Sequence, residues 1–485
     1  MFSSTLINVI VSALFLATHG NAAPAALPVS QSASASVVPP SSAPASVSTA
    51  FSTSVVPSSA VSVVTSDIPA SRISRSSSAP PATETVPYAS DDPNYVLWNS
   101  SDTKDPEPIR DSLGATILGP QNVNMDKQNP DLLAPPTTDS GTVGNAKWPF
   151  SLSHNRLQTG GWARQQNIGV LPMATEMAGV NMRLEVGAVR ELHWHKTAEW
   201  AYVVKGSVQV TAVNNLGQNF VGTVNPGDLW YFPAGIPHSL QATDANSDGA
   251  EFLLVFDDGN FSEDSTFLVT DWLAHIPKEV LAKNFKTDMS AFNGIPGEQL
   301  YIFPAAAPGP DSDAPSSPQG TSSQPYTFKA SEMNATQLDG GSVKIVDSNT
   351  FAVSKTIAMA EVTVQPGALR ELHWHPTQDE WSYFLEGNAR VTLFASQASA
   401  RTFNFQPGDV GYIPGSYGHY VENTGTTPLK YLEIFRTDTF QDVSLSQWLA
   451  LTPPDMVKAT LNLDDETMAH LSKVKQVVVG PSSSS

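Results

Sequence analysis

Two sets of polar side chains are spaced through this sequence as the ligands of a metal ion would be. The first set is His193, His195, Glu199 and His238, and the second is His373, His375, Glu380 and His419. Side chains two apart on a strand share a face, so each paired set of imidazoles can bind one ion. Three imidazoles and one carboxylate leave two open positions on an octahedral ion, which favours manganese, iron, nickel or copper over four-coordinate zinc.

The carboxylate of the second set requires a choice between two neighbours. The second copy has one more residue between its HxH pair and the glutamate than the first, and Asp379 stands at the shorter spacing. We select Glu380 because a tryptophan follows both glutamates, in Glu199-Trp200 and in Glu380-Trp381. The additional residue then belongs to the preceding turn. A lone HxH is often a packing element, but here it occurs twice with the same downstream partners.

An arginine stands three residues before the first histidine of each set, at Arg190 and at Arg370. A guanidinium beside the ion suits a carboxylate ligand, because it offers a fixed fork of donors and a positive charge. The alternative is a structural arginine that pairs with a neighbouring acid such as Glu191.

The two copies differ at one loop that follows each set. Between Phe261 and Trp272 the first copy has three more residues than the second copy has between Phe440 and Trp448. The additional residues belong to the segment SEDST at 262–266, and insertions beside a barrel mouth often make lids. Glu263 or Asp264 could move a proton there, although a solvated acidic turn is the plainer interpretation.

The second copy has Glu433 where the first has Leu254, and this glutamate could be only a buried hydrogen-bonded group.

An internal duplication underlies these sets. GAVRELHWH at 187–195 matches GALRELHWH at 367–375, PGDLWYFPAGIPH at 226–238 matches PGDVGYIPGSYGH at 407–419, and DWLAHIPKEV from 271 matches QWLALTPPDM from 447. Short β-type runs separated by PGD, PAG and PGS turns predict an all-β fold of two tandem barrels or jelly rolls. Helical spacing occurs only near the end of each copy, around 270–282 and 444–460. The region 87–180 predicts an irregular arm with strands at 114–118 and 151–155.

Composition sets the expected organisation of the chain. We predict a signal peptide at 1–22, a disordered Ser/Pro/Ala-rich segment at 23–86, an N-terminal domain with its arm at 87–304, a linker at 305–325 and a C-terminal domain at 326–485. The apolar run near the start is too short to span a bilayer. The chain is therefore expected to be secreted, as an extracellular or cell-wall-associated protein, and sequons at Asn99, Asn260 and Asn334 would suit a glycoprotein.

The 485 residues include no cysteine and carry a formal net charge of -20. Disulfides, thiolate metal sites and cysteine nucleophiles are therefore excluded. The negative charge disfavours nucleic acid and anionic membranes as partners. A small anionic substrate would need a local positive site.

The spacing of these residues is similar to that of the two cupin motifs, present twice. The pattern G-x5-HxH-x3,4-E-x6-G extends over Gly187–Gly206 and Gly367–Gly387, and G-x5-P-x-G-x2-H extends over Gly227–His238. The second copy departs from it with Ser416 in place of the glycine. From about residue 90 to the C-terminus the chain resembles the bicupins, and within them the oxalate decarboxylases.

This resemblance implies a fold, an activity and cofactors. It implies two jelly-roll-type cupin barrels with short C-terminal helices, two Mn(II) ions per chain, and dioxygen that is required but not consumed. Oxalate would bind beside Arg190, and Arg370 would be its counterpart in the second copy. The lid glutamate would be Glu263, which returns a proton to carbon, with Glu433 as a secondary candidate near the second metal. Related bicupins assemble from several copies, so a homo-oligomer is expected.

Three alternatives remain open at the level of the sequence. Oxalate oxidases share the fold, the ligands and the substrate but yield carbon dioxide and hydrogen peroxide. A dioxygenase acting on a flavonol-like substrate would require an apolar pocket, in which a charged residue such as Arg190 is not expected. A non-catalytic storage-type bicupin would usually lack the full ligand set, which both copies keep here.

Overall fold

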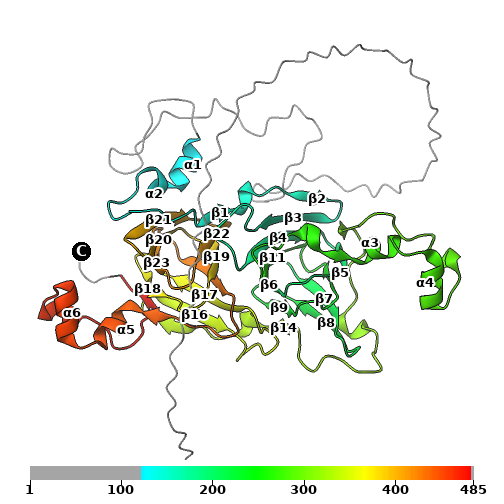
Figure 1. Cartoon of the computed structure of the whole chain (residues 1–485). Helices are drawn as coiled ribbons and strands as arrows, with labels where there is room; N and C mark the ends of the chain where they lie inside the picture. Colours follow the sequence, from blue (N-terminus) through cyan, green and yellow to red (C-terminus); the bar gives the residue numbers. More distant parts are fainter. Residues whose placement is uncertain (1–121, 482–485) are drawn as a thin grey trace, which may run out of the picture. The chain divides into compact units, whose positions relative to one another are not determined.

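The computed structural model describes residues 122–481 (Figure 1). The predicted signal peptide at 1–22, the Ser/Pro/Ala-rich segment at 23–86, the sequon at Asn99 and the predicted strand at 114–118 all lie outside the described residues. Within the described part of the chain, no helix is both long enough and apolar enough to cross a membrane.

The first copy folds into two antiparallel sheets, in the strand orders β14-β9-β6-β11-β4-β3-β2 and β12-β5-β10-β7-β8, with β13 also paired to β5. Its strands are β2 (Arg156–Gln158), β3 (Gly161–Gln166), β4 (Ala178–Leu184), β5 (Val189–Trp194), β6 (Glu199–Lys205), β7 (Val208–Val213), β8 (Asn219–Val224), β9 (Leu229–Phe232), β10 (His238–Ala242), β11 (Ala250–Phe256), β12 (Phe267–Leu268), β13 (Ile302–Phe303) and β14 (Thr327–Phe328). Strands β7 and β10 bury alternate side chains, whereas β4, β6, β9 and β11 of the other sheet are buried along most of their length, and together they form an apolar core.

The second copy repeats this arrangement, in the orders β1-β22-β19-β24-β17-β16-β15 and β21-β20-β23-β18-β25, with β26 also paired to β18. Its strands are β1 (Lys147–Pro149), β15 (Thr336–Leu338), β16 (Gly341–Val346), β17 (Ala358–Val364), β18 (Leu369–Trp374), β19 (Glu380–Glu386), β20 (Ala389–Ala395), β21 (Ser399–Phe405), β22 (Asp409–Ile413), β23 (Gly418–Asn423), β24 (Leu429–Phe435), β25 (Val443–Ser444) and β26 (Val478–Val479). The all-β prediction of two cupin barrels is confirmed.

One short strand next to each barrel in sequence pairs with the sheet of the other barrel. The strand β1 precedes the first barrel in sequence but pairs with β22 of the second, with Trp148 opposite Val410. The strand β14 precedes the second barrel but pairs with β9 of the first, with Thr327 opposite Trp230. These exchanged strands join the two barrels through backbone hydrogen bonds as well as through side chains.

Large side chains and glycines pack closely where the barrels meet. The buried Trp381 of the second barrel donates a 2.6 Å hydrogen bond from Nε1 to Oε1 of Gln166 in the first. Tyr202 donates a 2.8 Å hydrogen bond from its hydroxyl to Oε2 of Glu361. Burial, followed by the nearby Glu361 carboxylate, raises the pKa of Tyr202 above its usual range. One apolar cluster includes side chains from both barrels.

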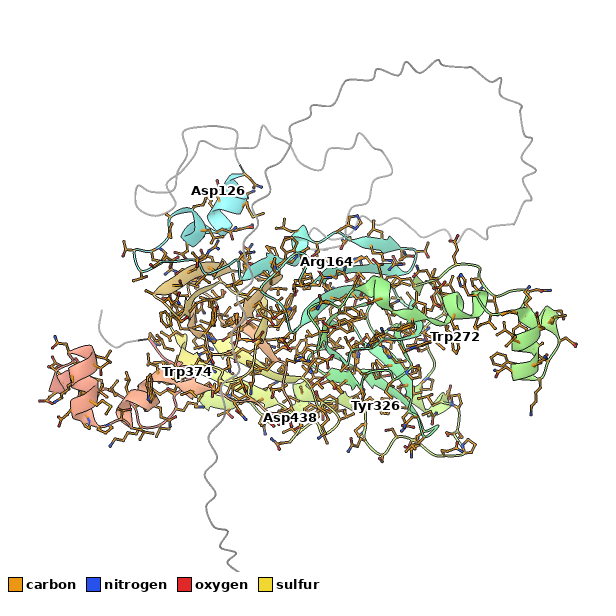
Figure 2. All side chains as sticks on the ribbon, viewed as in Figure 1. Asp126, Arg164, Trp272, Tyr326, Trp374 and Asp438 are labelled. Carbon is orange, nitrogen blue, oxygen red and sulfur yellow. The ribbon has the colours of Figure 1, made fainter. Side chains whose placement is uncertain are left out.

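Short helices occur mainly after the last strands of each barrel. Their bounds are α1 (Val123–Gln128), α2 (Pro130–Leu133), α3 (Val269–Ala274), α4 (Lys278–Phe285), α5 (Leu445–Ala450), α6 (Pro454–Leu461) and α7 (Asp465–Ala469). Helices were expected around 270–282 and 444–460, and each region is split in two at Pro277 and at Pro453-Pro454, because proline is poorly tolerated inside a helix. Figure 2 labels Trp272, which lies on α3 and is 56% exposed.

The segments 150–155 and 305–325 differ from the strand and the exposed linker that the sequence predicts there. The predicted strand at 151–155 is wrong: Phe150–Leu152 forms a 3-10 turn, because Phe150 is buried and its carbonyl accepts a hydrogen bond from the amide of Ser153. The segment 305–325 lies along β8, where Asp311 accepts a 2.9 Å hydrogen bond from the amide of Thr223.

Candidate metal and substrate site

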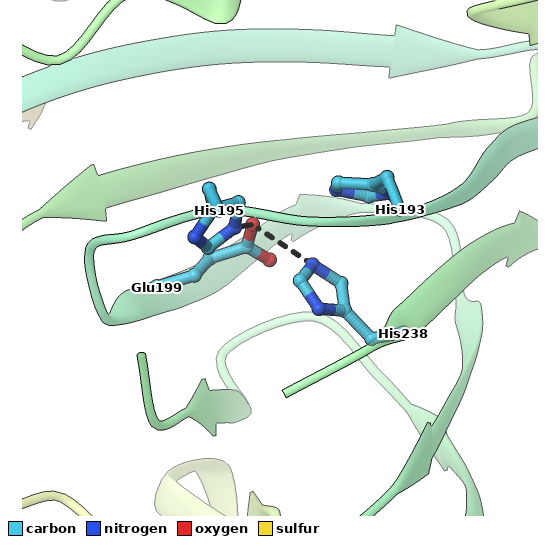
Figure 3. Close-up of side chains that lie close together, drawn as sticks. All are labelled: His193, His195, Glu199 and His238. Carbon is cyan, nitrogen blue, oxygen red and sulfur yellow. Dashed lines mark hydrogen bonds and ion pairs between the residues drawn. The ribbon is translucent and has the colours of Figure 1, made fainter. Parts of the chain in front are cut away.

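The ligand set of the first barrel gathers where β5, β6 and β10 meet (Figure 3). His238 on β10 stands directly opposite His193 on β5 in the antiparallel register. His195 follows β5, and Glu199 begins β6. One ligand atom from each of the four buried side chains lies within 4.8 Å of every other, so the predicted spacing does bring the set together.

The imidazoles of this set are oriented by the backbone. Their Nδ1 atoms contact carbonyl oxygens, with 2.5 Å from His193 to Glu191, 2.8 Å from His195 to Thr197 and 2.7 Å from His238 to Ile236. A carbonyl only accepts, so each Nδ1 carries the proton and each Nε2 keeps its lone pair. This is the ring orientation of histidines that bind metal through Nε2.

The Glu199 carboxylate completes the first set. Its Oε2 lies 3.1 Å from Nε2 of His195 and 3.4 Å from Nε2 of His238, while Oε1 accepts a 2.8 Å hydrogen bond from Trp230 Nε1. Burial tends to raise its pKa, but His238 and His195 hold the pKa of Glu199 well below its usual range. Burial also lowers the pKa of His193 and of His238. Neutral imidazoles and an ionised carboxylate are the forms that bind a divalent cation.

The second set repeats this geometry. His419 on β23 stands opposite His373 on β18, and one atom from each of His373, His375, Glu380 and His419 lies within 4.8 Å of the rest. The Nε2 atoms of the three histidines and Oε2 of Glu380 are buried without a hydrogen-bond partner among the described residues. The nitrogens do lie close to Oε2, at 3.1 Å from His375 and 3.2 Å from His419. Such convergence of unpartnered acceptors fits a bound cation and would be costly without one.

The arginine of the first barrel is buried next to the ligands. Arg190 is 3% exposed, and its guanidinium lies over the ring of Tyr301, 3.9 Å from the ring centroid. Among the described residues its one hydrogen bond runs 3.4 Å from Nη1 to the carbonyl of Tyr301. Glu191 does not pair with it, because Glu191 accepts from the amides of Thr270, Leu300 and Tyr301 instead. The guanidinium therefore has donors left for a ligand.

The lid segment lies against this arginine. Glu263 begins the 3-10 turn η3 (Glu263–Ser265), its amide donates a 3.0 Å hydrogen bond to Gln165 Oε1, and its side chain is buried. Burial raises the pKa of Glu263 to about 7, and the nearby Arg190 opposes this shift. Asp264 is 86% exposed and lies 3.4 Å from Nη1 of Arg156. Of the two acids in the segment, Glu263 is thus the buried one, and its charge interacts with those of Arg190 and Glu199.

A cavity of about 390 Å³ lies beside the lid segment. Its lining includes His195 together with Ser265 and Thr266 of the lid. The exposed Asp264 also lines this cavity, whereas Arg190, Glu263 and the other three ligands do not, so the cavity adjoins the site and is not the space around the ligands.

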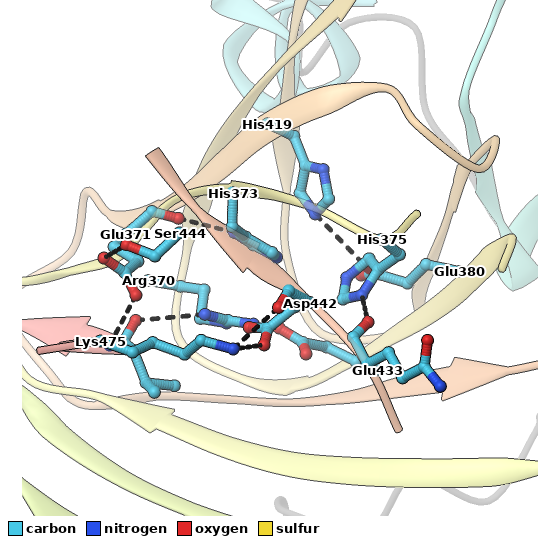
Figure 4. Close-up of polar contacts among 12 residues, drawn as sticks. Arg370, Glu371, His373, His375, Glu380, His419, Glu433, Asp442, Ser444 and Lys475 are labelled. Atoms are coloured by element: carbon cyan, nitrogen blue, oxygen red, sulfur yellow. Dashed lines mark hydrogen bonds and ion pairs between the residues drawn. The ribbon is translucent and has the colours of Figure 1, made fainter. Parts of the chain in front are cut away.

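The second barrel places its arginine in different surroundings (Figure 4). Arg370 is fully buried and lies 2.6 Å from Asp442 and 3.3 Å from Glu433. Sequence reasoning selected Glu433 but missed Asp442, Lys475 and Tyr301. Aligning the loop after Phe440 with the lid would have drawn attention to Asp442. Tyr301 had no counterpart in any motif.

Known proteins resemble this chain over both copies of the repeat. The family model described as Cupin matches residues 154–291 and again 328–469. The oxalate decarboxylase OxdC of Bacillus subtilis is 54% identical over 375 residues, which cover 77% of this chain and 97% of that protein. A probable oxalate decarboxylase of Arthroderma benhamiae is 44% identical over 379 residues, which cover 77% of this chain and 93% of that one.

Solved structures agree with these relatives. The structure of Bacillus subtilis oxalate decarboxylase at pH 4.6 matches with a TM-score of 0.75 and 53% identity, covering 78% of this chain and 99% of that one. A second structure of that enzyme, from a study of its Mn(II) centres, matches equally well and is covered over its full length.

Proposed function

This chain belongs to the cupin family, as one of its two-barrel oxalate decarboxylases, and from that premise we propose that it converts oxalate to formate and carbon dioxide with manganese(II) and dioxygen. The first barrel would be the main active site, with Glu263 as the group that moves the proton. The observation that carries the proposal is a buried carboxyl, Glu263, which interacts electrostatically with the buried guanidinium of Arg190 and with Glu199 of the gathered ligand set.

The ligand sets suit one manganese(II) ion each, so we propose two per chain. The proton-bearing Nδ1 atoms, the converging Nε2 lone pairs and the ionised carboxylate match the donor set of a divalent cation. When bound, manganese(II) would hold one carboxylate of oxalate and, with dioxygen as an electron acceptor that is not consumed, allow an electron to leave the substrate.

Arg190 would bind and orient the substrate. Its remaining N–H donors suit the second carboxylate of oxalate, and its charge offsets part of the charge of the dianion. The ring of Tyr301 beneath it keeps the guanidinium from rotating away.

Glu263 would move one proton twice. Its carboxylate first accepts the proton of singly protonated oxalate, the carbon–carbon bond breaks and carbon dioxide leaves. The carboxyl then returns that proton to the remaining carbon, so that hydrogen oxalate yields carbon dioxide and formate with atoms and charge balanced. The buried side chain of Glu263 would be shielded from water while it holds the proton, which disfavours oxidation of the one-carbon fragment.

The test compares Glu263→Gln with Asp264→Asn under air and under low dioxygen, measuring formate, hydrogen peroxide and bound manganese together. We expect Glu263→Gln to lose formate output while keeping its metal, and Asp264→Asn to keep both, because Asp264 points to solvent. Unchanged formate output from Glu263→Gln would defeat the assignment. Hydrogen peroxide in place of formate from the unmodified protein would indicate oxalate oxidase, and a metal-free protein would indicate a storage role.

We propose that the chain forms a homo-oligomer through its helical extensions. Trp272 and Phe285 on α3 and α4 are 56% exposed, and Trp448 and Met456 on α5 and α6 are similarly exposed at 54% and 60%. Exposed apolar side chains gathered on short helices are typical of subunit contacts. Light scattering on the purified protein would test this, and a monomer would contradict it.

We also propose secretion with N-linked glycans. The sequons at Asn260 and Asn334 are both exposed, so either could carry a glycan. A glycan on Asn260 would stand beside the lid cavity, which it also lines. Mass spectrometry of the exported protein before and after glycosidase treatment would test both sites and locate the mature N-terminus.

A further inference from the structure

The loop of the second barrel that corresponds to the lid ends in a buried ion pair. We call residues Thr439–Asp442 the second flap. Asp442 Oδ2 lies 2.6 Å from Nη2 of Arg370, and their side chains are 2% and 0% exposed. Lys475 holds the same residue from the other side, through an ion pair with the Asp442 carboxylate and a 2.8 Å hydrogen bond to its carbonyl. Figure 4 shows Arg370, Asp442 and Lys475 gathered beside the second ligand set.

Three nitrogens of the Arg370 guanidinium already have partners within the protein. Nη2 binds Asp442, Nε lies 3.3 Å from Oε1 of Glu433, and Nη1 donates to the carbonyl of Val477 at 3.4 Å. Arg190 in the first barrel has only its contact with the Tyr301 carbonyl among the described residues. A charge-assisted pair with a carboxylate is the interaction that a substrate would otherwise make with this guanidinium.

The second flap is also tied to the metal ligands. The carbonyl of Gln441 accepts a 2.8 Å hydrogen bond from Nδ1 of His375, and the carbonyl of Thr439 accepts a 3.0 Å bond from Gln378. In the first barrel the corresponding bond from His195 goes to Thr197, which lies outside the lid. The first lid can therefore move without disturbing a ligand, whereas the second flap cannot.

We propose that Asp442 is a built-in substitute for a substrate carboxylate, which occupies Arg370 and keeps oxalate out of the second metal centre. The metal centre of the second barrel would then be permanently inaccessible to oxalate, and substrate would bind in the first barrel alone. Removing Asp442 should expose a latent carboxylate-binding site. The inference rests on the proposed function only in taking oxalate as the ligand.

The test is oxalate binding by calorimetry to manganese-loaded full-length protein under low dioxygen. Arg190→Ala provides a background in which the first barrel binds oxalate poorly, and Asp442→Ala is added to it. We expect the double variant to bind about one more oxalate per chain than the background. Adding Arg370→Ala should abolish that increment. Glu433 remains beside Arg370 in the Asp442 variant, so the buried guanidinium keeps one acidic partner.

Lys475→Ala in the same background is the matched control. It removes the outer contact but leaves the pair between Asp442 and Arg370, so it should bind no additional oxalate. If the Asp442 variant unfolds more easily, acetate should raise its Tm by several degrees while leaving the Tm of the background unchanged. No added oxalate and no acetate effect, or an equal increment in the Lys475 control, would overturn the proposal. Formate production by the unmodified protein tests the first barrel separately.

Discussion

The guanidinium of Arg190 lies over the ring of Tyr301, with 3.9 Å between the guanidinium carbon and the ring centroid. The guanidinium of Arg156 contacts the same ring at 3.6 Å. Tyr301 is itself fixed by the Glu191 carboxylate, which accepts a 2.8 Å hydrogen bond from the Tyr301 amide. A residue with no part in either cupin motif thus positions the proposed substrate-binding arginine.

Replacing Tyr301 with leucine should weaken oxalate binding more than it slows turnover. A desolvated cation–π contact is worth about 0.5–2 kcal/mol, so KM should rise roughly 2- to 30-fold while kcat changes little. Tyr301→Phe is the control, because it keeps the ring and removes a buried hydroxyl that has no hydrogen-bond partner among the described residues. Steady-state kinetics on both variants would check this. An equal rise in KM for the two variants would show that the hydroxyl matters rather than the ring.

Decarboxylation should decline as pH rises through neutrality. The pKa of Glu263 is raised to about 7 by burial, so near and below that pH one proton can stay in the complex, on Glu263 or on oxalate, and above it that proton is lost. The proposed reaction needs one proton shared between Glu263 and oxalate, and the complex lacks that proton at high pH. We expect kcat to fall about tenfold per pH unit once the proton is lost. The kcat profile between pH 5 and 9 would check this, and a flat profile would contradict the role given to Glu263.

The sequence predicted those features that follow from spacing and repetition. The HxH pair on a strand, the glutamate at the start of the next strand and the opposing third histidine lie together in both barrels, including Glu380 rather than Asp379. Asp379 instead accepts hydrogen bonds from Tyr412 and from the amide of Gly415.

Contacts between segments far apart in the chain could not be predicted in this way. Arg190 and Arg370 occupy the same place in the repeat, yet one lies under a lid and the other is paired with Asp442. Nothing in the local pattern distinguishes them, because the difference comes from residues 72 and more positions away. The exchange of β1 and β14 between the barrels was missed for the same reason.

Loss of one ligand should remove one metal ion per chain and leave the other barrel loaded. His193→Ala and His373→Ala each delete a buried imidazole from a separate set, so each variant should retain about one manganese where the unmodified protein should hold about two. Removing both ions with a chelator should lower the Tm, because carboxylate and imidazole groups then converge without a cation. Elemental analysis and calorimetry would check this. Loss of both ions from either single variant would show that the two sites are coupled.

The packing between barrels should be sensitive to a single methyl group at Gly179. A Cβ there would lie 2.2 Å from Cζ2 of Trp381, a fully buried ring held by its hydrogen bond to Gln166. The ring cannot move away without losing that bond, so Gly179→Ala should destabilise the protein by about 1–3 kcal/mol. Gly294→Ala is the control, because a Cβ at that position would meet no atom within 4 Å. Thermal unfolding of the two variants would compare them, and an equal Tm would mean that the barrels separate enough to admit the methyl group.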